Sequence, residues 1–171
     1  MGSVDQGMLV DVVNSNDVPV GVLARAEVFR KHANFRVAHD LIFNTSGQLL
    51  VQKLAPTRLR HPEYWGSSVA AYLFAGESYQ AAAERRLNQE LGVRGLDLDF
   101  IGKISMNDDG CQKFVGIFSA VHDGPFTYDK KHIEKLEFLS LQQIHHLHHS
   151  GERLFTPTFL RVLSYYESRI Q

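Results

Sequence analysis

The residues best suited to chemistry gather in one stretch of the chain, residues 71–93, which reads AYLFAGESYQAAAERRLNQELGV. Arg86, Gln89 and Glu90 lie close together in this stretch, so a helix would carry them on one face. A guanidinium matches the geometry of a phosphate group, an amide oxygen can ligate a cation without adding charge, and a carboxylate adds both a ligand and a charge. Side chains of these types can bind a phosphate or ligate a cation, provided that a secondary-structure element brings them together.

A helix over residues 79–91 is predicted to position these groups. Ser78 is a favoured N-cap residue, and Gly92 stands where a C-terminal glycine belongs. An apolar stripe recurs every four residues, at Tyr79, Ala83, Leu87 and Leu91. The neighbouring stripe consists of Ala82, Arg86, Gln89 and Glu90. We expect the apolar stripe to face the core and the second stripe to face a cleft.

The rest of the chain predicts a mixed β-sheet flanked by helices, an α+β fold. Strands are expected at residues 9–14, 18–23, 35–43, 48–54, 99–106, 111–122 and 133–139, with strand and loop over 65–74. Further helices are expected at residues 24–31, 141–149 and 158–169. Short polar turns join most of the strands as hairpins, including an N-terminal hairpin.

Length and composition predict one domain of 171 residues, with residues 1–34 as an N-terminal hairpin and short helix and 35–171 as the core. The formal net charge of -1 gives no argument for binding nucleic acid or an anionic membrane. No apolar run approaches the ~18 residues of a membrane span. Cys111 is the single cysteine, which excludes an internal disulfide or a cysteine-based zinc site and fits a cytoplasmic protein.

Residues 71–93 resemble the Nudix box, Gly-x5-Glu-x7-Arg-Glu-apolar-x-Glu-Glu-x-Gly-apolar. The matching residues are Glu77, Arg85, Leu87, Glu90, Gly92 and Val93. Ala71 replaces the opening glycine, and Arg86 and Gln89 replace two of the three helix glutamates. Further segments from about residue 8 to about residue 167, among them LLVQK, GPF and FTP, resemble a bacterial subgroup akin to isopentenyl-diphosphate isomerase.

The resemblance implies an α/β/α sandwich and roles for the box residues. In the family, the helix glutamates hold Mg²⁺, with Mn²⁺ as an alternative, and the metal bridges a pyrophosphate and activates a water. Glu90 is then the expected metal ligand, Gln89 a neutral one, and backbone groups of residues 67–71 lie near the metal. Glu77 and Arg85 are expected to pair and hold the loop against the helix. Because two carboxylates are missing, we expect weak Mg²⁺ affinity and a site completed by substrate phosphates.

A further acidic ligand of this subgroup falls at His132, with Glu134 and Glu137 nearby. His132 or Glu134 is a candidate for an extra ligand or a base, and the choice stays open. The basic residues Lys53, Arg58 and Arg60, followed by His61, precede the box. They are candidates for phosphate recognition, and the alternative is an ordinary solvated loop.

The resemblance favours a metal-dependent hydrolase of the phosphoanhydride bond in nucleoside di- or triphosphates or related nucleoside diphosphate derivatives. Glu90, Arg86 and Gln89 are its candidate catalytic residues, and a small nucleotide is its expected partner. The alternative is a catalytically weak or inactive nucleotide-binding or regulatory module; a structural domain without a ligand is less favoured. The related isomerases need a reactive cysteine near the loop before the box. Residues 59–64 of this chain occupy that place and contain no cysteine, so isomerase activity is disfavoured. Whether the chain forms a homodimer stays open.

Other conspicuous residues favour structural interpretations. Tyr64, Trp65, Tyr72, Phe74 and Phe114 are candidates for stacking on a nucleobase, although such rings more often belong to the core. His145, His146, His148 and His149 are crowded enough to suggest a metal site, but no glutamate lies between them in the H-E-x-x-H manner. We expect a solvated histidine surface and a Cys111 that packs as a small strand residue.

Overall fold

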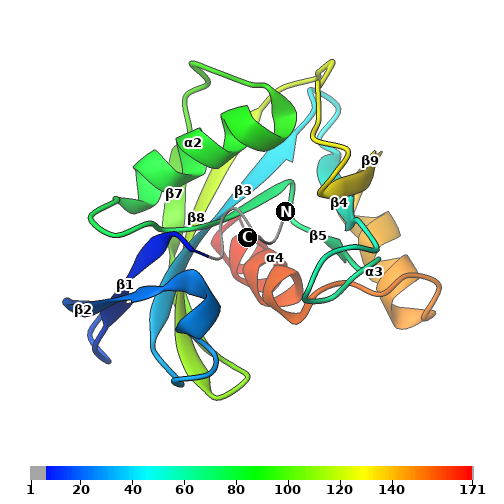
Figure 1. Cartoon of the computed structure of the whole chain (residues 1–171). Helices are drawn as coiled ribbons and strands as arrows, with labels where there is room; N and C mark the ends of the chain where they lie inside the picture. The colour runs from blue at the N-terminus through cyan, green and yellow to red at the C-terminus, as the bar shows by residue number, and fades with distance from the viewer. Residues whose placement is uncertain (1–6, 171) are drawn as a thin grey trace.

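The structure, a computed structural model, describes residues 7–170 as a mixed β-sheet flanked by helices (Figure 1). The strands are β1 Leu9–Val13, β2 Pro19–Ala24, β3 Phe35–Phe43, β4 Leu49–Leu54, β5 Trp65–Gly66, β6 Val69–Tyr72, β7 Asp99–Asp108, β8 Cys111–Val121 and β9 Ile133–Leu139. The helices are the 3-10 turn η1 Arg25–Glu27, α2 Tyr79–Leu91, α3 Leu141–His149 and α4 Pro157–Ile170. The predicted fold class is therefore confirmed. The two outer bounds of the predicted domain, residues 1 and 171, lie outside the described residues.

The main sheet forks between β3 and β4. β3 pairs in parallel with β8 over its full length and antiparallel with β6 from Val37 to Asp40. β4 meets β3 only where Phe43 faces Leu49, and it then pairs with β5 and β9. The predicted hairpin of residues 35–54 thus exists as a turn, but its two strands diverge, and the candidate site forms where they separate.

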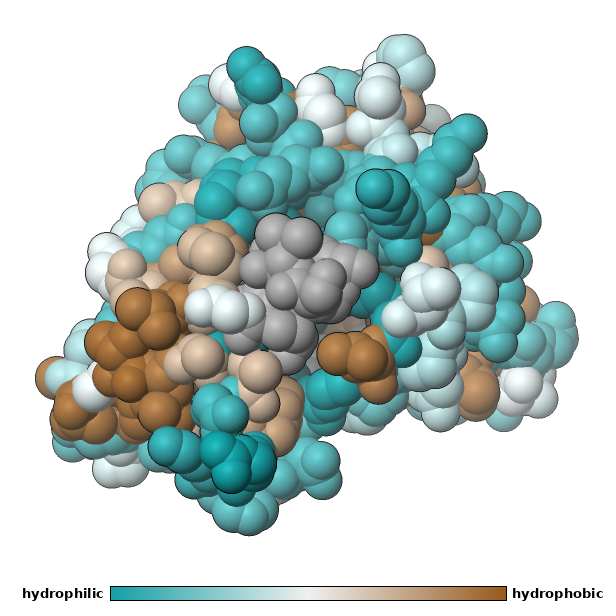
Figure 2. All heavy atoms as spheres, viewed as in Figure 1, coloured by the Kyte–Doolittle hydropathy of each residue, from teal (hydrophilic) through white to brown (hydrophobic). Residues whose placement is uncertain are grey.

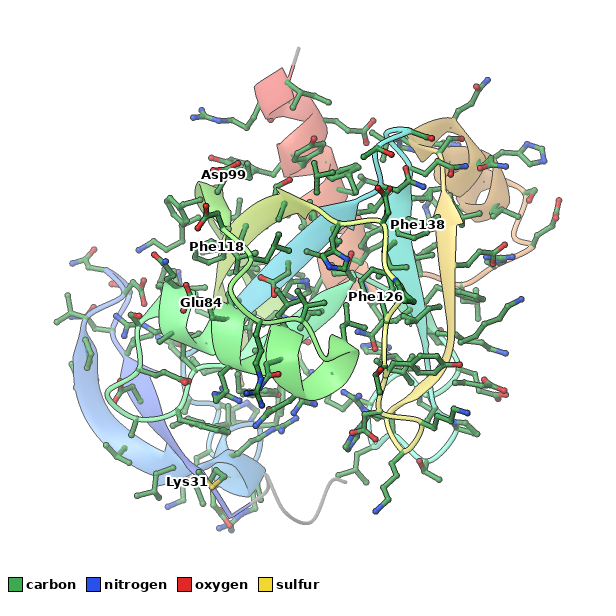
Figure 3. All side chains as sticks on the ribbon, turned by 90° about the horizontal axis from the view of Figure 1, so that it is seen from above. Lys31, Glu84, Asp99, Phe118, Phe126 and Phe138 are labelled. Carbon is green, nitrogen blue, oxygen red and sulfur yellow. The ribbon has the colours of Figure 1, made fainter. Side chains whose placement is uncertain are left out.

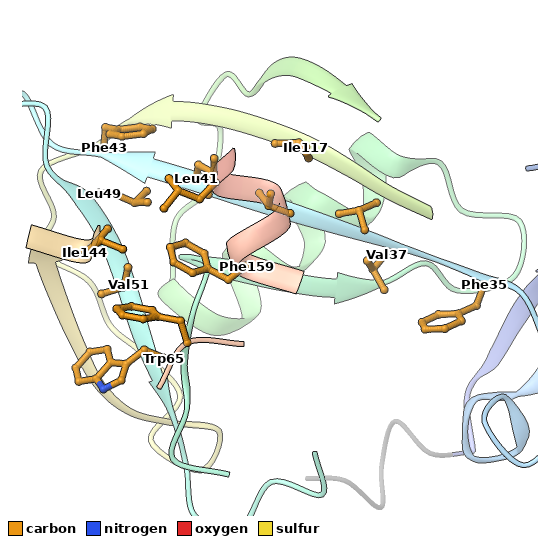
Figure 4. Close-up of a cluster of buried hydrophobic side chains, with 14 of the residues drawn as sticks. Phe35, Val37, Leu41, Phe43, Leu49, Val51, Trp65, Ile117, Ile144 and Phe159 are labelled. Carbon is orange, nitrogen blue, oxygen red and sulfur yellow. The ribbon is translucent and has the colours of Figure 1, made fainter. Parts of the chain in front are cut away.

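Helices cover both faces of the sheet, and β3 divides its side chains between them. Phe35, Val37 and Leu41 belong to a core cluster that includes Phe159 of α4 and Ile144 of α3 (Figure 4). Ala38 and Ile42, on the alternate positions, pack in the clusters beneath α2. This period of two is expected for a strand buried on both sides. It makes β3 the strand that links the site to both layers of the core.

Helix α2 begins and ends where the sequence predicts. The Ser78 hydroxyl accepts a hydrogen bond from the Ala81 amide at 3.1 Å, and Gly92 adopts a left-handed φ of 70° while its amide bonds the Asn88 carbonyl. Figure 3 shows the helix lying across the sheet, viewed from above. Ala83, Leu87 and Leu91 are buried, so the predicted core stripe is confirmed. The helix is therefore held in register by its caps and its apolar stripe.

The N-terminal hairpin is present, but the helix predicted over residues 24–31 is wrong. Only η1 forms there, followed by tight turns in which Lys31 bonds Glu27 and Ala33 bonds Val28. A segment this short has little helix stability of its own, and burying Val28 completely decides its path instead. Val18, Val20 and Val22 of the hairpin are exposed. A hydrophobic area lies at the lower left of Figure 2, where Figure 1 shows β1 and β2 in the same view. Among residues 7–170, no helix is long and apolar enough to cross a membrane.

Candidate functional site

A pocket with a volume of about 300 Å³ opens at the fork of the sheet. Residues of β3, β6 and α2 line it, together with the loop that follows β4. Five arginines and one lysine lie in its walls: Arg25, Arg58, Arg60, Arg85, Arg86 and Lys113. Among the described residues that line it there is no Asp or Glu. An apolar and aromatic cavity with this charge is suited to an anionic small molecule.

Glu90 lies in a small recess that adjoins this pocket and shares His39, Arg58 and Ala70 with it. Its carboxylate is only 2% exposed, and it accepts hydrogen bonds from Arg86 Nη2 at 3.1 Å and Gln52 Nε2 at 3.2 Å. Gln52 also donates to the Ser68 carbonyl at 2.8 Å. Because Arg86 is one helical turn away, α2 itself supplies the cation that balances Glu90.

Gln89 points away from this recess. It is exposed, lines neither pocket, and accepts from Arg85 at 3.3 Å and from Arg86 at 3.4 Å through its amide oxygen. The side chain that the sequence suggests as a neutral metal ligand therefore lies on the rim of the site and already accepts from two arginines.

Glu77 and Arg85 fasten the loop before α2 to the helix. Arg85 donates to both carboxylate oxygens of Glu77, at 2.8 and 3.0 Å, and to the Tyr72 carbonyl at 2.9 Å. Glu77 in turn accepts from the Phe74 amide at 2.9 Å. These bonds fix the path of the chain from β6 to α2, and hence the wall of the pocket.

Asp40 is a buried carboxyl group that the sequence analysis missed. It lies on the α2 side of β3, is 1% exposed, and neither oxygen has a hydrogen-bond partner among residues 7–170. Burial raises the pKa of Asp40 well above its usual value, and the charges of Glu90 and Glu84 add to the effect. A carboxylate in the middle of a long, mostly apolar strand was the pattern that could have revealed it.

The floor of the pocket contains two more groups that the sequence analysis missed. His39 Nδ1 lies 2.7 Å from the Ser67 hydroxyl, and complete burial, with the charge of Lys113, lowers the pKa of His39 to about 3. Lys113 donates to Asp108 at 2.6 Å and to the Thr158 hydroxyl at 2.5 Å. The floor thus presents a neutral imidazole beside a bonded ammonium group.

The three basic residues predicted for phosphate recognition occupy different positions. Arg58 lines both pockets, and its Nη1 has no hydrogen-bond partner within the described part of the chain. Arg60 lines the main pocket but donates to both oxygens of Asp108, at 3.0 and 2.7 Å. Lys53 lies outside both linings and pairs with Glu134 at 3.2 Å. The structure therefore brings Arg58 and Arg60 to the site and leaves Lys53 away from it.

Comparison with known proteins identifies the family. The family model of the NUDIX domain matches residues 34–159. A Pseudomonas aeruginosa protein described as an uncharacterized Nudix hydrolase, PA4841, is 32% identical over 131 residues, which are 77% of this chain and 78% of that protein. The chain belongs to the Nudix family. Membership supports a hydrolase that acts on pyrophosphate bonds, whereas the subgroup akin to isopentenyl-diphosphate isomerase stays a prediction.

Solved structures share the Nudix fold. DR0079 from Deinococcus radiodurans aligns with a TM-score of 0.81 at 22% identity, over 92% of this chain and 99% of its own. The NUDIX domain of Shewanella oneidensis NrtR, complexed with ADP ribose, aligns with a TM-score of 0.64 at 12% identity, over 87% of this chain and all of its own. At these identities the likeness concerns the fold alone.

The other candidate residues of this Nudix chain are distributed around the pocket. Tyr72 and Phe74 line it, each beneath a guanidinium at 3.9 Å from the ring centre, those of Arg25 and Arg85. Phe29 and Phe35, which the sequence analysis did not single out, also line it. Trp65 and Phe114 are buried side chains outside the lining, and Tyr64 also lies outside it. Aromatic surface is therefore available, but arginines already cover part of it.

His132 and Glu134 belong to different surroundings. His132 is buried and hydrogen-bonded to Asp129, and burial lowers its pKa, with nearby Arg86 and Arg58 adding to the effect. Glu134 is paired with Lys53, and Glu137 is paired with Arg153 at 2.7 Å. Of these candidates, His132 is the one whose charge state depends on the arginines of the site.

The remaining histidines and the cysteine lie elsewhere. His145 bonds Glu167 at 2.9 Å, and His146 lies 3.7 Å from Glu152. Cys111 is fully buried in the core, and burial raises the pKa of its thiol. None of these side chains lines the pocket.

The side chains present do not fit a divalent cation held by the Nudix helix, although the family generally uses such metals. Within residues 7–170, no group of three or more His, Cys, Asp or Glu side chains is placed to hold a metal ion. Both oxygens of Glu90 already accept hydrogen bonds, and one of the donors is a guanidinium. A hard cation needs several anionic or neutral oxygen ligands, and beside Glu90 the recess offers one buried side-chain oxygen without a hydrogen-bond partner among the described residues, Gln52 Oε1.

Proposed function

We propose that this Nudix protein binds a small molecule carrying a diphosphate group, of the nucleoside diphosphate class, and hydrolyses its phosphoanhydride bond. The observation that carries the proposal is the pocket lined by six cationic side chains next to the buried carboxylate of Glu90. A diphosphate supplies the negative charge that this pocket lacks. Phosphate oxygens also accept the charge-assisted bonds that guanidinium groups donate.

Arg58 is the proposed anchor for phosphate. Burial lowers the pKa of its guanidinium, and one of its nitrogens is buried without a hydrogen-bond partner among the described residues. A buried donor without a partner costs free energy, which a bound anion recovers. Arg58 also lines both the main pocket and the recess of Glu90, so a phosphate bonded there would lie between the two.

The rest of the pocket suits the organic part of such a ligand. Phe29, Phe35, Tyr72 and Phe74 provide ring surface around the cationic wall. Planar bases stack on aromatic rings and on guanidinium planes. The ADP ribose complex of the NrtR domain, which shares the fold, supports a nucleoside diphosphate derivative as the class of ligand.

The chemistry proposed for this site uses the side chains of the chain itself. Glu90 would accept the proton of a water that attacks phosphorus, since it is the carboxylate in the recess beside Arg58. Arg86 and Arg58 would neutralise the charge that develops on the phosphoryl oxygens. The leaving phosphate would depart towards the main pocket, which is also cationic.

A second candidate function is binding without turnover. The observation that favours it is the bond between Arg86 and Glu90, which occupies the carboxylate that hydrolysis would need. Such a protein would bind the same diphosphate and release no product.

An assay of phosphate release from a panel of nucleoside di- and triphosphates, with and without Mg²⁺, tests the proposal. We expect turnover by the wild type and a loss of about 100-fold or more in kcat for Glu90→Gln, because the base is removed. Glu84→Gln is the matched control, an exposed glutamate on the same helix, and it should retain wild-type activity. Binding without turnover in the wild type would instead establish the second candidate.

A further inference from the structure

The arrangement of Arg86 and Glu90 bears on how the phosphate is held. We infer that the Arg86 guanidinium serves as a built-in cation, so that the pocket binds a fully ionised terminal diphosphate without any divalent metal. The inference rests on the proposed function, since it concerns the same pocket. It adds to that function the charge state of the ligand and the claim that the ligand binds without a metal ion.

The first step is the position of Arg86. Its side chain lines the main pocket, while Glu90, to which it donates at 3.1 Å, lines the adjoining recess. The pair is nearly closed to solvent, with side-chain exposures of 10% and 3%. The same positive group therefore bonds the carboxylate and lines the space where a ligand would lie.

The second step is that Glu90 is held in this position from both sides. Gln52 donates to Glu90 at 3.2 Å and to the carbonyl of Ser68, the residue before β6, at 2.8 Å, so its amide nitrogen is held by two acceptors. A metal bound by Glu90 would have to compete with both Arg86 and Gln52 for its oxygens. The guanidinium of Arg86 has no acceptor atom and cannot serve as a ligand. Of the two donors, only Gln52 carries an oxygen, Oε1, which has no hydrogen-bond partner among the described residues and could supply one neutral ligand.

The third step is the charge of the pocket. Three carboxylates form ion pairs with cations of the lining. Glu77 pairs with Arg85, and Glu90 pairs with Arg86. Asp108 pairs with both Arg60 and Lys113. These three carboxylates offset three of the six positive charges in the lining, which leaves about three for the ligand. A divalent cation would add to this excess and be repelled. A terminal diphosphate, whose last ionisation has a pKa near ~6, matches the excess at neutral pH better than a diphosphate esterified at both ends.

Calorimetric titration of the wild type with ADP and with ADP ribose, in EDTA and in excess Mg²⁺, tests the inference. We expect ADP to bind at least as tightly in EDTA as in Mg²⁺, and more tightly than ADP ribose. Binding that appears only with Mg²⁺ would overturn the inference and leave the proposed function standing. Absence of binding under both conditions would overturn both.

Two variants separate the role of Arg86 from a general loss of charge. Arg86→Gln should weaken ADP binding in EDTA by about 10-fold or more, because a charge-assisted bond is lost. The double variant Arg86→Glu with Gln89→Glu should make ADP binding dependent on Mg²⁺. Arg94→Gln, at an arginine outside the pocket, is the matched control and should bind like the wild type; thermal melting checks that each variant folds.

Discussion

At the scale of single residues, surroundings separate basic side chains that look equivalent in the sequence. Lys53, Arg58 and Arg60 fall within eight positions of one another. Lys53 has a carboxylate partner on the neighbouring strand, Arg60 has one in Asp108, and Arg58 faces the pocket with one nitrogen unbonded in the described part of the chain. Only Arg58 is therefore placed to gain a bond from a ligand without losing one.

The first prediction concerns Arg58. Arg58→Gln should weaken nucleoside diphosphate binding by about 10-fold or more, since a desolvated guanidinium bonded to phosphate contributes about 1.5–3 kcal/mol. Lys53→Gln, which removes the same charge from outside the pocket, should change the dissociation constant by less than about twofold. Calorimetric titration of the two variants measures the difference. Equal losses in both would show that only the general positive field matters.

The surroundings of Gln89 also differ from those of its neighbours on the helix. Gln89 shares the helical face of Arg86 and Glu90 by spacing, yet it is exposed while they are buried. The position of a residue on a helix predicts roughly which way its side chain points. The packing of the helix on the sheet then decides which of the side chains on that face are buried. The prediction that Gln89 ligates a metal stays untested, and its contacts with two arginines weigh against it.

At the scale of elements, β3 carries two buried ionisable groups on opposite faces. His39 faces the pocket side with a pKa of about 3, and Asp40 faces α2 with a raised pKa. Burial therefore favours the neutral form of both groups in the folded protein. Unfolding shifts His39 towards binding a proton and Asp40 towards releasing one, so their two contributions to proton uptake on unfolding oppose each other.

The second prediction follows from the sign of these shifts. Above the ordinary histidine pKa of 6.5, His39 is neutral in both states, and of the two groups only Asp40 still binds more protons in the folded state. Asp40 therefore lowers the free energy of unfolding as pH rises towards its folded pKa. Asp40→Asn removes this term. Its stability relative to the wild type should therefore increase with pH, with a limiting slope of about 1.4 kcal/mol per pH unit.

Urea unfolding of both proteins at a series of pH values above the unfolded pKa of Asp40 measures this slope. His39→Gln is the matched control, because it replaces the neighbouring buried group and should change stability relative to the wild type chiefly at acid pH. A difference between Asp40→Asn and the wild type that does not vary with pH would contradict the raised pKa of Asp40.

At the scale of the whole molecule, Asp17 ties the N-terminal hairpin to the core. Its carboxylate accepts from Arg36 at 2.6 Å, Tyr79 at 2.7 Å and Lys103 at 2.7 Å, groups that belong to β3, α2 and β7. Burial alone would raise the pKa of Asp17, but the bonds from Arg36, Lys103 and Tyr79 outweigh it and lower the pKa. The hairpin is thereby held over the end of the helix that carries the site.

The third prediction is that Asp17→Asn costs about 3 kcal/mol of unfolding free energy at neutral pH, because cationic partners of a buried carboxylate lose their counter-charge. The lowered pKa means that the wild type keeps this stability at neutral pH and loses it as pH falls through the folded pKa of Asp17. The gap between the two proteins should therefore narrow in acid. Glu27→Gln, which removes an exposed ion pair with Arg30, should change stability by less than about 1 kcal/mol. Denaturant titrations measure both variants, and a neutral-pH cost no larger than that of Glu27→Gln would contradict the tie.

The sequence by itself determined the features that depend on neighbours along the chain. The caps at Ser78 and Gly92 and the apolar stripe of α2 are local patterns, and the structure confirms them. The exception is residues 24–31, where the local pattern favours a helix and burial of Val28 favours tight turns. Helix caps and apolar periodicity depend on residues that are only a few positions apart, so the amino-acid sequence suffices to predict them.

Only the tertiary structure decided how the site is composed. The divergence of β3 and β4 brings Arg58 beside Glu90, places His39 and Asp40 on opposite faces of one strand, and leaves Lys53 outside the pocket. The burial of Arg86 against Glu90 likewise follows from the packing of α2 on β3 and β6. Contacts between distant residues and the loss of solvent around a charge arise when strands and helices pack together, and spacing along the chain contains neither.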